Sequence, residues 1–431
     1  MSKMSKLAKY PSYKESGVEW LGEIPEHWET LSNKNIFKIK QKLVGKKSSE
    51  YDLLSLTIKG IIKRDMENPQ GKFPAEFNTY QEVKQGDFIF CLFDVEETPR
   101  TVGLSQFDGM ITGAYTVMTA KDIDKSYLYY FYLNLDSSKR FKPLYRGLRN
   151  TIPKDSFFSF KTFIPPKQEQ TKIASYLDEK TSQIDNAIGQ KERLIELLKE
   201  RRQIVINEVV TGKLRVNNEE LKMKDSGVEW IGEIPKHWEV VRSKRLFRER
   251  KDKARKGDRQ LTASQKYGVI YQDEFMRLEG RKVTQVVHNY EILKRAEKND
   301  FLISMRSFQG GIEYCRDTGS ISSAYVALIP IKHVVSEYFK YLFKSQKYIT
   351  ALSSTSNLVR DGQALRFDNF SLVDLLIIPE NEQKEIAEYL DNQTTKIDKA
   401  IELQQSYIER LKEYKATLID SVVTGKVKVA S

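Results

Sequence analysis

The sequence predicts an α+β fold in which two globular α/β domains are separated by two long helices that form an antiparallel coiled coil. The whole is expected to be a pseudo-two-fold internal repeat. Residues 14–29 return at 224–239 with 13 of 16 positions identical. A second repeat begins at Glu169 and returns at Glu382, and heptad patterning follows each copy. The stretches between these copies agree only loosely, so one scaffold carries two divergent inserts.

The first repeated segment, KESGVEWLGEIPEHWE, is expected to be an extended or turn-rich lead-in to each half. Gly17, Gly22 and Pro25 punctuate it, and glycine and proline favour turns. We expect its aromatic residues to anchor the lead-in on its domain, with a binding role as the alternative. These residues are Trp20, His27, Trp28, Trp230, His237 and Trp238.

Each lead-in is followed by a long insert with short β-like runs. Asp87–Phe93 corresponds to Asp300–Met305, and Ile111–Met118 corresponds to Ile321–Ile329. The two inserts should therefore share a mixed α+β fold although their sequences have diverged. Aromatic helices are expected to follow these runs, at Tyr127–Leu135 and Tyr338–Tyr348.

Each half closes with a long helix, which is expected to start after Pro166 or Pro379 because proline favours a helix start. Heptad spacing places one set of residues at the seam of a coiled coil. The seam residues are Leu177, Ile184, Ile188, Ile195, Leu198, Leu390, Ile397, Ile401, Ile408 and Leu411. Polar interruptions coincide between the copies, at Lys191 with Gln404 and at Arg202 with Lys415. Gly212 and Gly425 are expected to end the helices.

The helix length predicts the orientation of the pair. About 42 helical residues give a rod of ~60 Å, whereas a 150-residue globule is only ~35–40 Å across. A parallel pairing would require the second insert to bridge the whole rod, for which it is too small. The helices should therefore run antiparallel, with one insert at each end.

The net charge of +12 is unevenly distributed. Val241–Arg259 contains ten basic and three acidic residues, and Leu31–Lys47 contains six lysines and no acidic residue. Such blocks suit a polyanion such as nucleic acid, although they also suit solvated surface faces. Their recurrence at the same place in both halves favours the polyanion.

Composition and motifs exclude several other classes. The 431 residues are 40% hydrophobic and 30% charged, with no apolar run long enough to span a bilayer and no signal-peptide pattern, so we expect a cytoplasmic location. Cys91 and Cys315 have no partners that would indicate a disulfide framework or a zinc site. We find no phosphate-binding loop, dinucleotide loop or catalytic triad motif, and we predict neither catalytic nor metal-binding residues.

The combined pattern resembles the specificity (S) subunits of type I restriction–modification enzymes. The lead-in SGVEWLGEIPEHW and its copy carry the resemblance, together with the helix starts IPPKQEQTKIASYLDEKTSQID and IPENEQKEIAEYLDNQTTKID and the two VVTGK ends. The stretch DFLISMRSFQGGIEYCRDTGSISSAYVALIP is similar as well, so the resemblance covers nearly the whole chain. The second helix departs by beginning IPEN in place of IPPK, a change expected to affect its first turn only.

The resemblance implies a division of labour along the chain. Residues 1–165 and 216–378 would be target recognition domains, and residues 166–215 and 379–431 would be the conserved helices between them. Each recognition domain would read one half of a bipartite, asymmetric site on double-stranded DNA. The chain would dock two modification subunits, which carry S-adenosylmethionine and methylate adenine at N6. Restriction subunits, with ATP and Mg, would add translocation and cleavage. The chain itself would bind no cofactor and catalyse nothing.

Candidate DNA contacts come from polar stretches within the inserts, because Arg suits guanine and Asn or Gln suits adenine in the major groove. They are Arg100, Arg140, Arg146, Arg149, Asn150, Lys154, Arg306, Ser307, Gln309, Arg360, Gln363 and Arg366. Basic blocks are expected to bind phosphate, which fixes position without reading sequence. These candidates are Lys42, Lys46, Lys47, Arg250, Lys251, Lys253, Arg255 and Lys256.

Two other classes remain open at this point. A coiled-coil assembly adaptor that does not read DNA would explain the helices and the repeated frames, but not the basic blocks or the divergence confined to the inserts. A self-contained nuclease would need catalytic motifs that the sequence lacks. Neither the DNA sequence that is read nor the length of its spacer follows from the residues.

Overall fold

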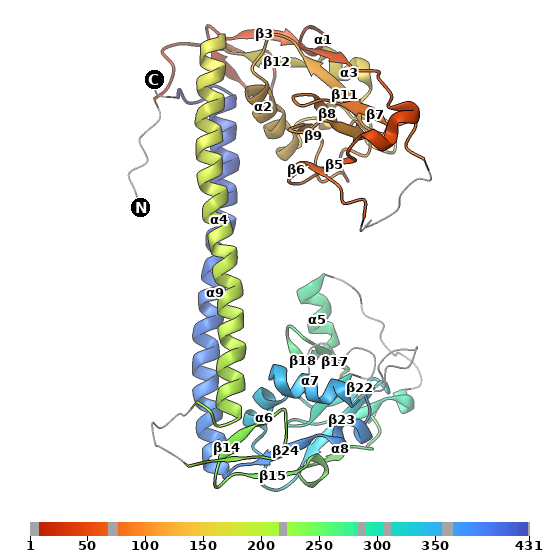
Figure 1. Cartoon of the computed structure of the whole chain (residues 1–431), viewed down its shortest axis with the longest axis vertical. Helices are drawn as coiled ribbons and strands as arrows, with labels where there is room; N and C mark the ends of the chain where they lie inside the picture. The colour runs from red at the N-terminus through yellow and green to blue at the C-terminus, as the bar shows by residue number, and fades with distance from the viewer. Residues whose placement is uncertain are drawn as a thin grey trace. The chain divides into compact units, whose positions relative to one another are not determined.

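The computed structural model describes residues 8–67, 76–214, 222–280, 282, 290–304, 312–355 and 365–429. The chain divides into two compact units, Met1–Lys191 with Ser406–Ser431 (unit 1) and Glu192–Gln405 (unit 2). Each unit contains one lead-in, one insert and a part of each long helix (Figure 1). No described helix combines the length and the apolar character that crossing a membrane requires.

The insert of unit 1 is built from short strands and three short α-helices. The elements of its lead-in and insert are β1 (Tyr13–Glu15), β2 (Glu23–Pro25), β3 (Glu29–Ser32), α1 (Asn33–Ile36), β4 (Phe37–Ile39), η1 (Gly45–Glu50), β5 (Leu54–Thr57), β6 (Gly60–Lys63), β7 (Gln81–Val83), β8 (Phe88–Phe90), β9 (Val102–Leu104), β10 (Gly109–Ile111), β11 (Thr116–Ala120), α2 (Lys125–Ser137), η2 (Lys142–Leu144), α3 (Lys154–Ser159) and β12 (Lys161–Ile164). Helix α4 (Lys167–Val210) follows.

Unit 2 repeats this order with additions. Its elements are β13 (Met223–Asp225), β14 (Glu233–Pro235), β15 (Glu239–Arg242), η3 (Ser243–Arg245), β16 (Phe247–Glu249), β17 (Leu261–Ser264), β18 (Gly268–Tyr271), α5 (Gln272–Glu279), η4 (Tyr290–Ile292), β19 (Lys294–Ala296), β20 (Phe301–Ser304), β21 (Glu313–Tyr314), β22 (Gly319–Ile321), β23 (Tyr325–Pro330), α6 (Ser336–Leu342), α7 (Gln346–Ser354), α8 (Phe367–Leu372) and β24 (Asp374–Ile377). Helix α9 (Glu380–Val423) ends the second half.

Both units have the same antiparallel sheet topology. A four-stranded sheet has the order β4-β11-β8-β9 in unit 1 and β16-β23-β20-β21 in unit 2. The pairs β3–β12, β5–β6 and β7–β10 recur as β15–β24, β17–β18 and β19–β22. The cores match as well: Phe37 packs edge-on against Phe88 at 5.3 Å between ring centroids, and Phe247 packs in the same way against Phe301 at 5.7 Å. The inserts are therefore two versions of one fold.

The long helices run antiparallel within each unit, as the sequence predicted. In unit 1, Lys415 of α9 pairs with Asp185 of α4 at 2.6 Å. In unit 2, Arg202 of α4 pairs with Asp398 of α9 at 3.3 Å. Asp398 lies 213 residues after Asp185, and Lys415 lies 213 after Arg202, so the polar interruptions of the heptads form equivalent ion pairs.

Apolar seam positions lie on the faces where α4 and α9 pack. Leu177, Ile184 and Ile195 are buried on α4, and Leu390, Ile397 and Ile408 are buried on α9, whereas the other four predicted seam residues are half-buried. Each helix begins directly after a proline, and the IPEN departure leaves the first turn unchanged. Gln170 N donates to Pro166 O and Gln383 N donates to Pro379 O, both at 3.0 Å.

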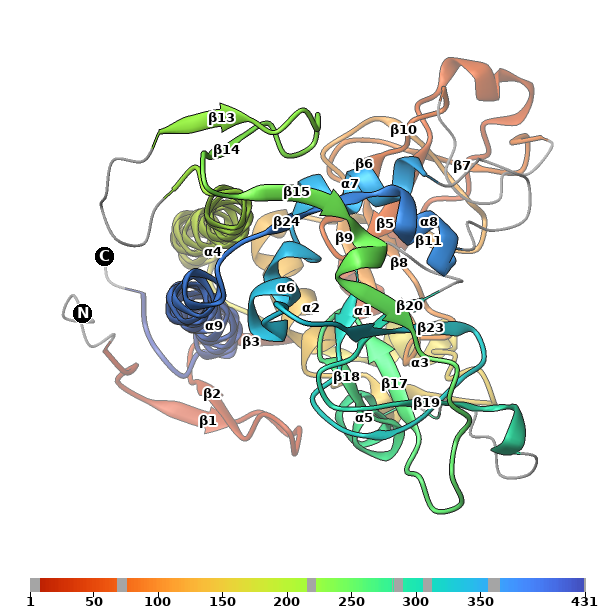
Figure 2. The same ribbon diagram turned by 90° about the horizontal axis from the view of Figure 1, so that it is seen from below.

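The lead-ins form short hairpins, β1–β2 and β13–β14, which lie against α9 and α4 respectively (Figure 2). Gly425 ends α9 with a φ of +72°, and a Cβ there would clash with Pro25. Gly212 ends α4 in the same conformation, with a φ of +73°, against Pro235. Each VVTGK sequence is thus a left-handed helix end shaped to receive a lead-in.

A single carboxylate at the start of each long helix fastens the lead-in. Glu169 accepts hydrogen bonds from Trp28 Nε1 at 3.1 Å and Tyr10 Oη, and it pairs with His27 Nε2 at 2.8 Å. Glu382 holds Trp238 and His237 in the same way, at 2.8 and 2.6 Å. The structural role predicted for these residues is therefore what the geometry gives them.

Two expectations about the inserts need correction. The aromatic helix expected at Tyr338–Tyr348 is two helices, α6 and α7, because Ser345 starts a new helix by accepting a hydrogen bond from Tyr348 N. The run Ile111–Met118 is likewise not one element: it holds the end of β10, a turn and the start of β11. The division of the chain into four segments remains a prediction, since each compact unit draws on both long helices.

Candidate nucleic-acid interface

Four predicted contact residues of unit 1 come together around one hairpin turn. Arg146 N donates to Thr151 O at 2.8 Å and Thr151 N donates back at 3.0 Å, which closes the loop RGLRNT. Gly147 and Asn150 turn the chain with φ values of +70° and +44°. The loop rests on the segment after β8, where Asp94 N donates to Arg149 O at 2.9 Å. Arg146 and Arg149 are exposed, and so is Lys154 at the start of α3.

The hairpin also carries a residue that the sequence did not single out. Leu148 lies between the two arginines and has a relative exposure of 105%, so its side chain contacts nothing else in the unit. A fully exposed leucine held on a closed turn between two cations is suited to contact a thymine methyl group or to wedge between bases. Its signal in the sequence was the pattern RGLRN itself, an apolar residue inside a polar turn.

Arg100 and Arg140 have structural contacts away from this hairpin. Arg100 Nη2 donates to Ile58 O at 2.6 Å, at the β5–β6 turn. The Arg140 guanidinium pairs with Asp420 of α9 at 2.8 Å and lies 4.6 Å from the centroid of the Trp20 ring. A base contact by Arg140 would break both interactions, so we withdraw it from the predicted DNA contacts.

The lysine block of unit 1 is exposed only in part. Lys46 and Lys47 lie on the surface of η1. Lys42 instead pairs with Glu82 at 2.7 Å, a hydrogen bond that raises the pKa of Lys42 and lowers that of Glu82. Lys42 could contact phosphate only in competition with Glu82.

The basic block of unit 2 forms an exposed loop with a buried anchor. The exposed residues are Lys251, Lys253, Arg255 and Lys256. Arg250 is buried and bonds Asp300 through Nε at 2.6 Å and Nη2 at 3.0 Å. Burial alone would lower the pKa of Arg250, but hydrogen bonds to Asp300 and Asp252 outweigh it and raise the pKa. A phosphate could reach Arg250 only by displacing these carboxylates, so we withdraw it from the predicted contacts.

The remaining candidates of unit 2 are described only in part. Arg366 is exposed at the start of α8, where its backbone N–H donates to Asn369 Oδ1 at 3.1 Å. The other five candidates lie outside the described residues: Arg306, Ser307, Gln309, Arg360 and Gln363. All base and phosphate contacts named from the sequence stay predictions.

The thiols and carboxylates of the described residues do not form a metal or redox site. No group of three or more His, Cys, Asp or Glu side chains in the described ranges could hold a metal ion. Cys91 and Cys315 are buried and unpaired, and burial raises the pKa of both thiols. A buried thiol with a raised pKa has little thiolate character and is a poor nucleophile.

Comparison with known proteins places this fold and surface in one family. Residues 235–413 match the family model of the type I restriction modification DNA specificity domain. The chain is 23% identical to the putative type I restriction enzyme MjaX specificity subunit of Methanocaldococcus jannaschii, over 95% of this chain and 96% of that protein.

Solved structures have the same fold. A chain from a study of complex assembly and conformational transition of the type I R-M system superposes with a TM-score of 0.66 and 12% identity, covering 93% of this chain and 98% of that one. The HsdS subunit of Thermoanaerobacter tengcongensis superposes with a TM-score of 0.48 and 13% identity, covering 94% and 98%. The predicted α+β fold with its antiparallel helices is confirmed.

The fold and the matched domain define a DNA-specificity protein of the type I restriction–modification class. Within that class, the relative that matches over the full length is a specificity subunit, and the resemblance predicted from the repeats is confirmed. The chain is thus identified as a type I specificity subunit, a component that is itself non-catalytic.

Proposed function

We propose that the chain reads a bipartite, asymmetric DNA site, with one half-site recognised by each insert. One observation carries this proposal: the inserts share a topology strand for strand, yet present different surfaces. Unit 1 projects the hairpin with Leu148, while unit 2 carries the exposed basic loop and the helix α5 between β18 and β19. A common fold with divergent exposed residues is what two readers of different half-sites require.

The exposed cations would position the DNA without reading it. Lys46 and Lys47 in unit 1 and the loop Lys251–Lys256 in unit 2 are free of the buried pairing that holds Arg250. Phosphate contacts fix register and orientation, whereas base edges carry the sequence information. The hairpin residues Arg146, Leu148 and Arg149 would then make base contacts in one half-site.

The long helices would serve as a spacer and as a docking surface. A 44-residue helix is about 66 Å long, and half-sites on one face of a duplex lie about 34–36 Å apart or a multiple of this. On α4, Leu194, Leu197 and Ile204 are exposed and share one face by their spacing of three and seven residues. Exposed apolar stripes of this kind mark protein interfaces.

The proposed partners are two modification subunits, which would bring S-adenosylmethionine and methylate adenine at N6. Restriction subunits with ATP and Mg would add translocation and cleavage. A relative's structure concerns complex assembly of a type I R-M system, which supports a multi-subunit setting for this chain. The chain itself would supply recognition and no catalytic group.

A DNA shift assay with the modification subunit present tests this function against an adaptor that does not read DNA. If the six exposed basic residues, Lys46, Lys47, Lys253, Arg255, Lys256 and Lys251, all contact phosphate, log K should fall against log salt with a slope of about −5. Replacing Lys253, Arg255 and Lys256 by alanine should reduce that slope by about 3. An adaptor would show no salt-dependent shift. Cutting of plasmid by the chain alone with magnesium would indicate a nuclease instead.

A further inference from the structure

Unit 1 holds a carboxylate near the end of α9 among three donors. Asp420 accepts from Lys426 Nζ at 2.7 Å, from Arg140 Nη1 at 2.8 Å and from Asn134 Nδ2 at 3.2 Å. Burial alone would raise the pKa of Asp420, but the hydrogen bonds from Lys426 and Arg140 outweigh it and hold the pKa below its usual value. The positive charge at this corner of unit 1 is therefore balanced from within.

The internal repeat places a neutral residue at the same corner of unit 2. Asn207 of α4 lies 213 residues before Asp420, and Lys213 lies 213 before Lys426, so the lysine is kept while its carboxylate is lost. Helix α7 adds a second cation, Lys347, next to Lys213. Among the described residues, neither lysine forms an ion pair.

The electrostatics of the lysine pair reflect this loss. Burial lowers the pKa of Lys347, and the neighbouring ammonium of Lys213 lowers it further. Glu208 opposes the shift but is not within ion-pair distance. Two ammonium groups that repel one another are stabilised by an anion that binds between or beside them.

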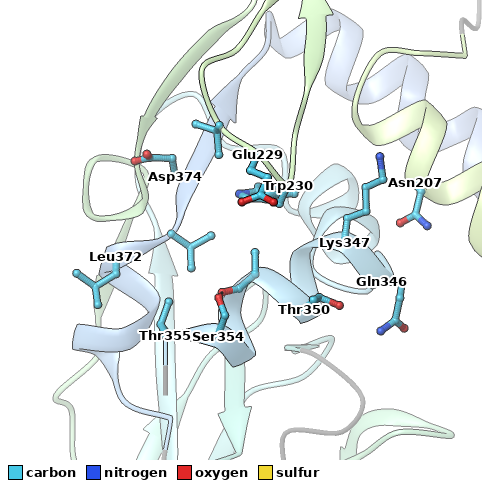
Figure 3. Close-up of a pocket in the computed structure, with 13 residues that line it drawn as sticks. Asn207, Glu229, Trp230, Gln346, Lys347, Thr350, Ser354, Thr355, Leu372 and Asp374 are labelled. Carbon is cyan, nitrogen blue, oxygen red and sulfur yellow. The ribbon is translucent and has the colours of Figure 1, made fainter. Parts of the chain in front are cut away.

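A pocket of about 720 Å³ opens beside Lys347 (Figure 3). The lead-in contributes Val228 and Trp230, α4 contributes Asn207, and Leu372 and Val373 close the apolar side. In Figure 3, Lys347 stands between Trp230 and Asn207 in the view. The pocket thus combines a cationic end with an apolar wall.

Two buried polar atoms of the lining lack partners among the described residues. They are Trp230 Nε1 and Asn207 Oδ1. Buried polar atoms without a partner are uncommon and call for a ligand or another explanation. The amide of Asn207 can be turned to present Nδ2, since its O and N atoms are exchanged at little cost to the fit. The lining can then offer donors from an indole, an amide and an ammonium.

We propose that this pocket of unit 2 binds a carboxylate of a protein partner, an Asp or Glu side chain with an apolar neighbour. Asp420 in unit 1 is the template, because the same corner of the same fold is filled there by a carboxylate from the chain itself. The apolar wall favours a protein segment over a DNA phosphate. The inference rests on the proposed function, in which the partner is the modification subunit.

Substitutions based on the repeat test the proposal in the assembled complex. Asn207→Asp should install the arrangement of unit 1: it should raise the Tm of the chain and weaken binding of the modification subunit. Lys347→Glu should weaken that binding by about tenfold or more, because a like charge would face the partner's carboxylate. Asp420→Asn is the matched control, and it should lower the Tm without changing partner binding.

Chemical cross-linking gives a second readout. Carbodiimide joins an ammonium to a carboxylate in direct contact, so the wild-type complex should yield a peptide that links Lys347 or Lys213 to an acidic residue of the modification subunit. Unchanged partner affinity in both Asn207→Asp and Lys347→Glu would overturn the proposal. So would weakened DNA binding with unchanged assembly, which would make the pocket a phosphate site. Failure of the wild-type chain to bind the modification subunit would instead overturn the proposed function.

Discussion

Glu169 connects three side chains of the first lead-in to the start of α4, and it does so at little exposure. Glu169→Ala would leave Trp28 Nε1 and Tyr10 Oη without their acceptor. We expect a loss of about 2–3 kcal/mol in the free energy of unfolding, because unpaired buried donors carry a desolvation cost. Chemical denaturation measures this loss.

The exposed Glu179 provides the control, since it pairs only with its neighbours on the helix. Glu179→Ala should leave the denaturation midpoint nearly unchanged. If Glu169→Ala were as stable as the wild type, the lead-in would be held by apolar packing alone.

Leu148 is the residue whose change should separate DNA reading from folding. Because its side chain is fully exposed, Leu148→Ser should not alter stability. In the complex we expect it to reduce discrimination in one half-site by roughly tenfold, as loss of an apolar base contact does. Leu148→Met keeps an apolar tip and should retain the wild-type preference. A competition assay with site variants measures both, and equal discrimination by Leu148→Ser and wild type would exclude Leu148 from the interface.

The residue roles that could be predicted were those that the repeat marks twice. Trp28 and Trp238, or Gly212 and Gly425, recur in the same surroundings, and each has the structural role that the sequence assigned. The roles of Arg140 and Arg250 could not be predicted, because their partners Asp420 and Asp300 are 280 and 50 residues away. Basic composition groups a buried ion pair with a free surface cation, and only the fold distinguishes them.

At the scale of elements, the helix pair was predictable and the insert elements were less so. Heptad spacing is local and repeats over many turns, so both long helices and their polar layers followed from the sequence. The strands have three to six residues, and they are paired across loops that the sequence does not register. The break between α6 and α7 depends on one capping serine, Ser345, within an aromatic run that favours continuous helix.

The register of the helix pair makes a testable prediction. Seven residues inserted after Lys191 in α4 alone would move Arg202 by about 10 Å relative to Asp398. This single insertion should lower the Tm and disrupt the pairing. A matched insertion in both helices, with the second after Gln405, should restore the Tm because the register is recovered.

The same pair of insertions tests the helices as a spacer. In the complex, the matched variant should methylate a site whose gap between half-sites is longer. If the matched insertion were stable but recognised the original gap, the helix length would not set the spacing.

At the scale of the whole molecule, the duplicated fold is the feature that the sequence predicted best. The repeats predicted two inserts of one fold, and the matching sheets β4-β11-β8-β9 and β16-β23-β20-β21 bear this out. The division into compact units was not predicted, since it cuts each long helix and groups the two chain ends in unit 1. Heptad spacing gives no indication of where along a helix the packing changes from one globular body to the other.

Methylation-sensitive sequencing of a genome that carries this chain and its modification partner tests most directly whether two units read two half-sites. We predict one methylated motif made of two different half-sites separated by a gap of fixed length. Exchanging the insert of unit 1 for that of a related chain should change one half-site and leave the other and the gap intact. A single continuous motif, or a motif that does not change when the insert is exchanged, would contradict this function.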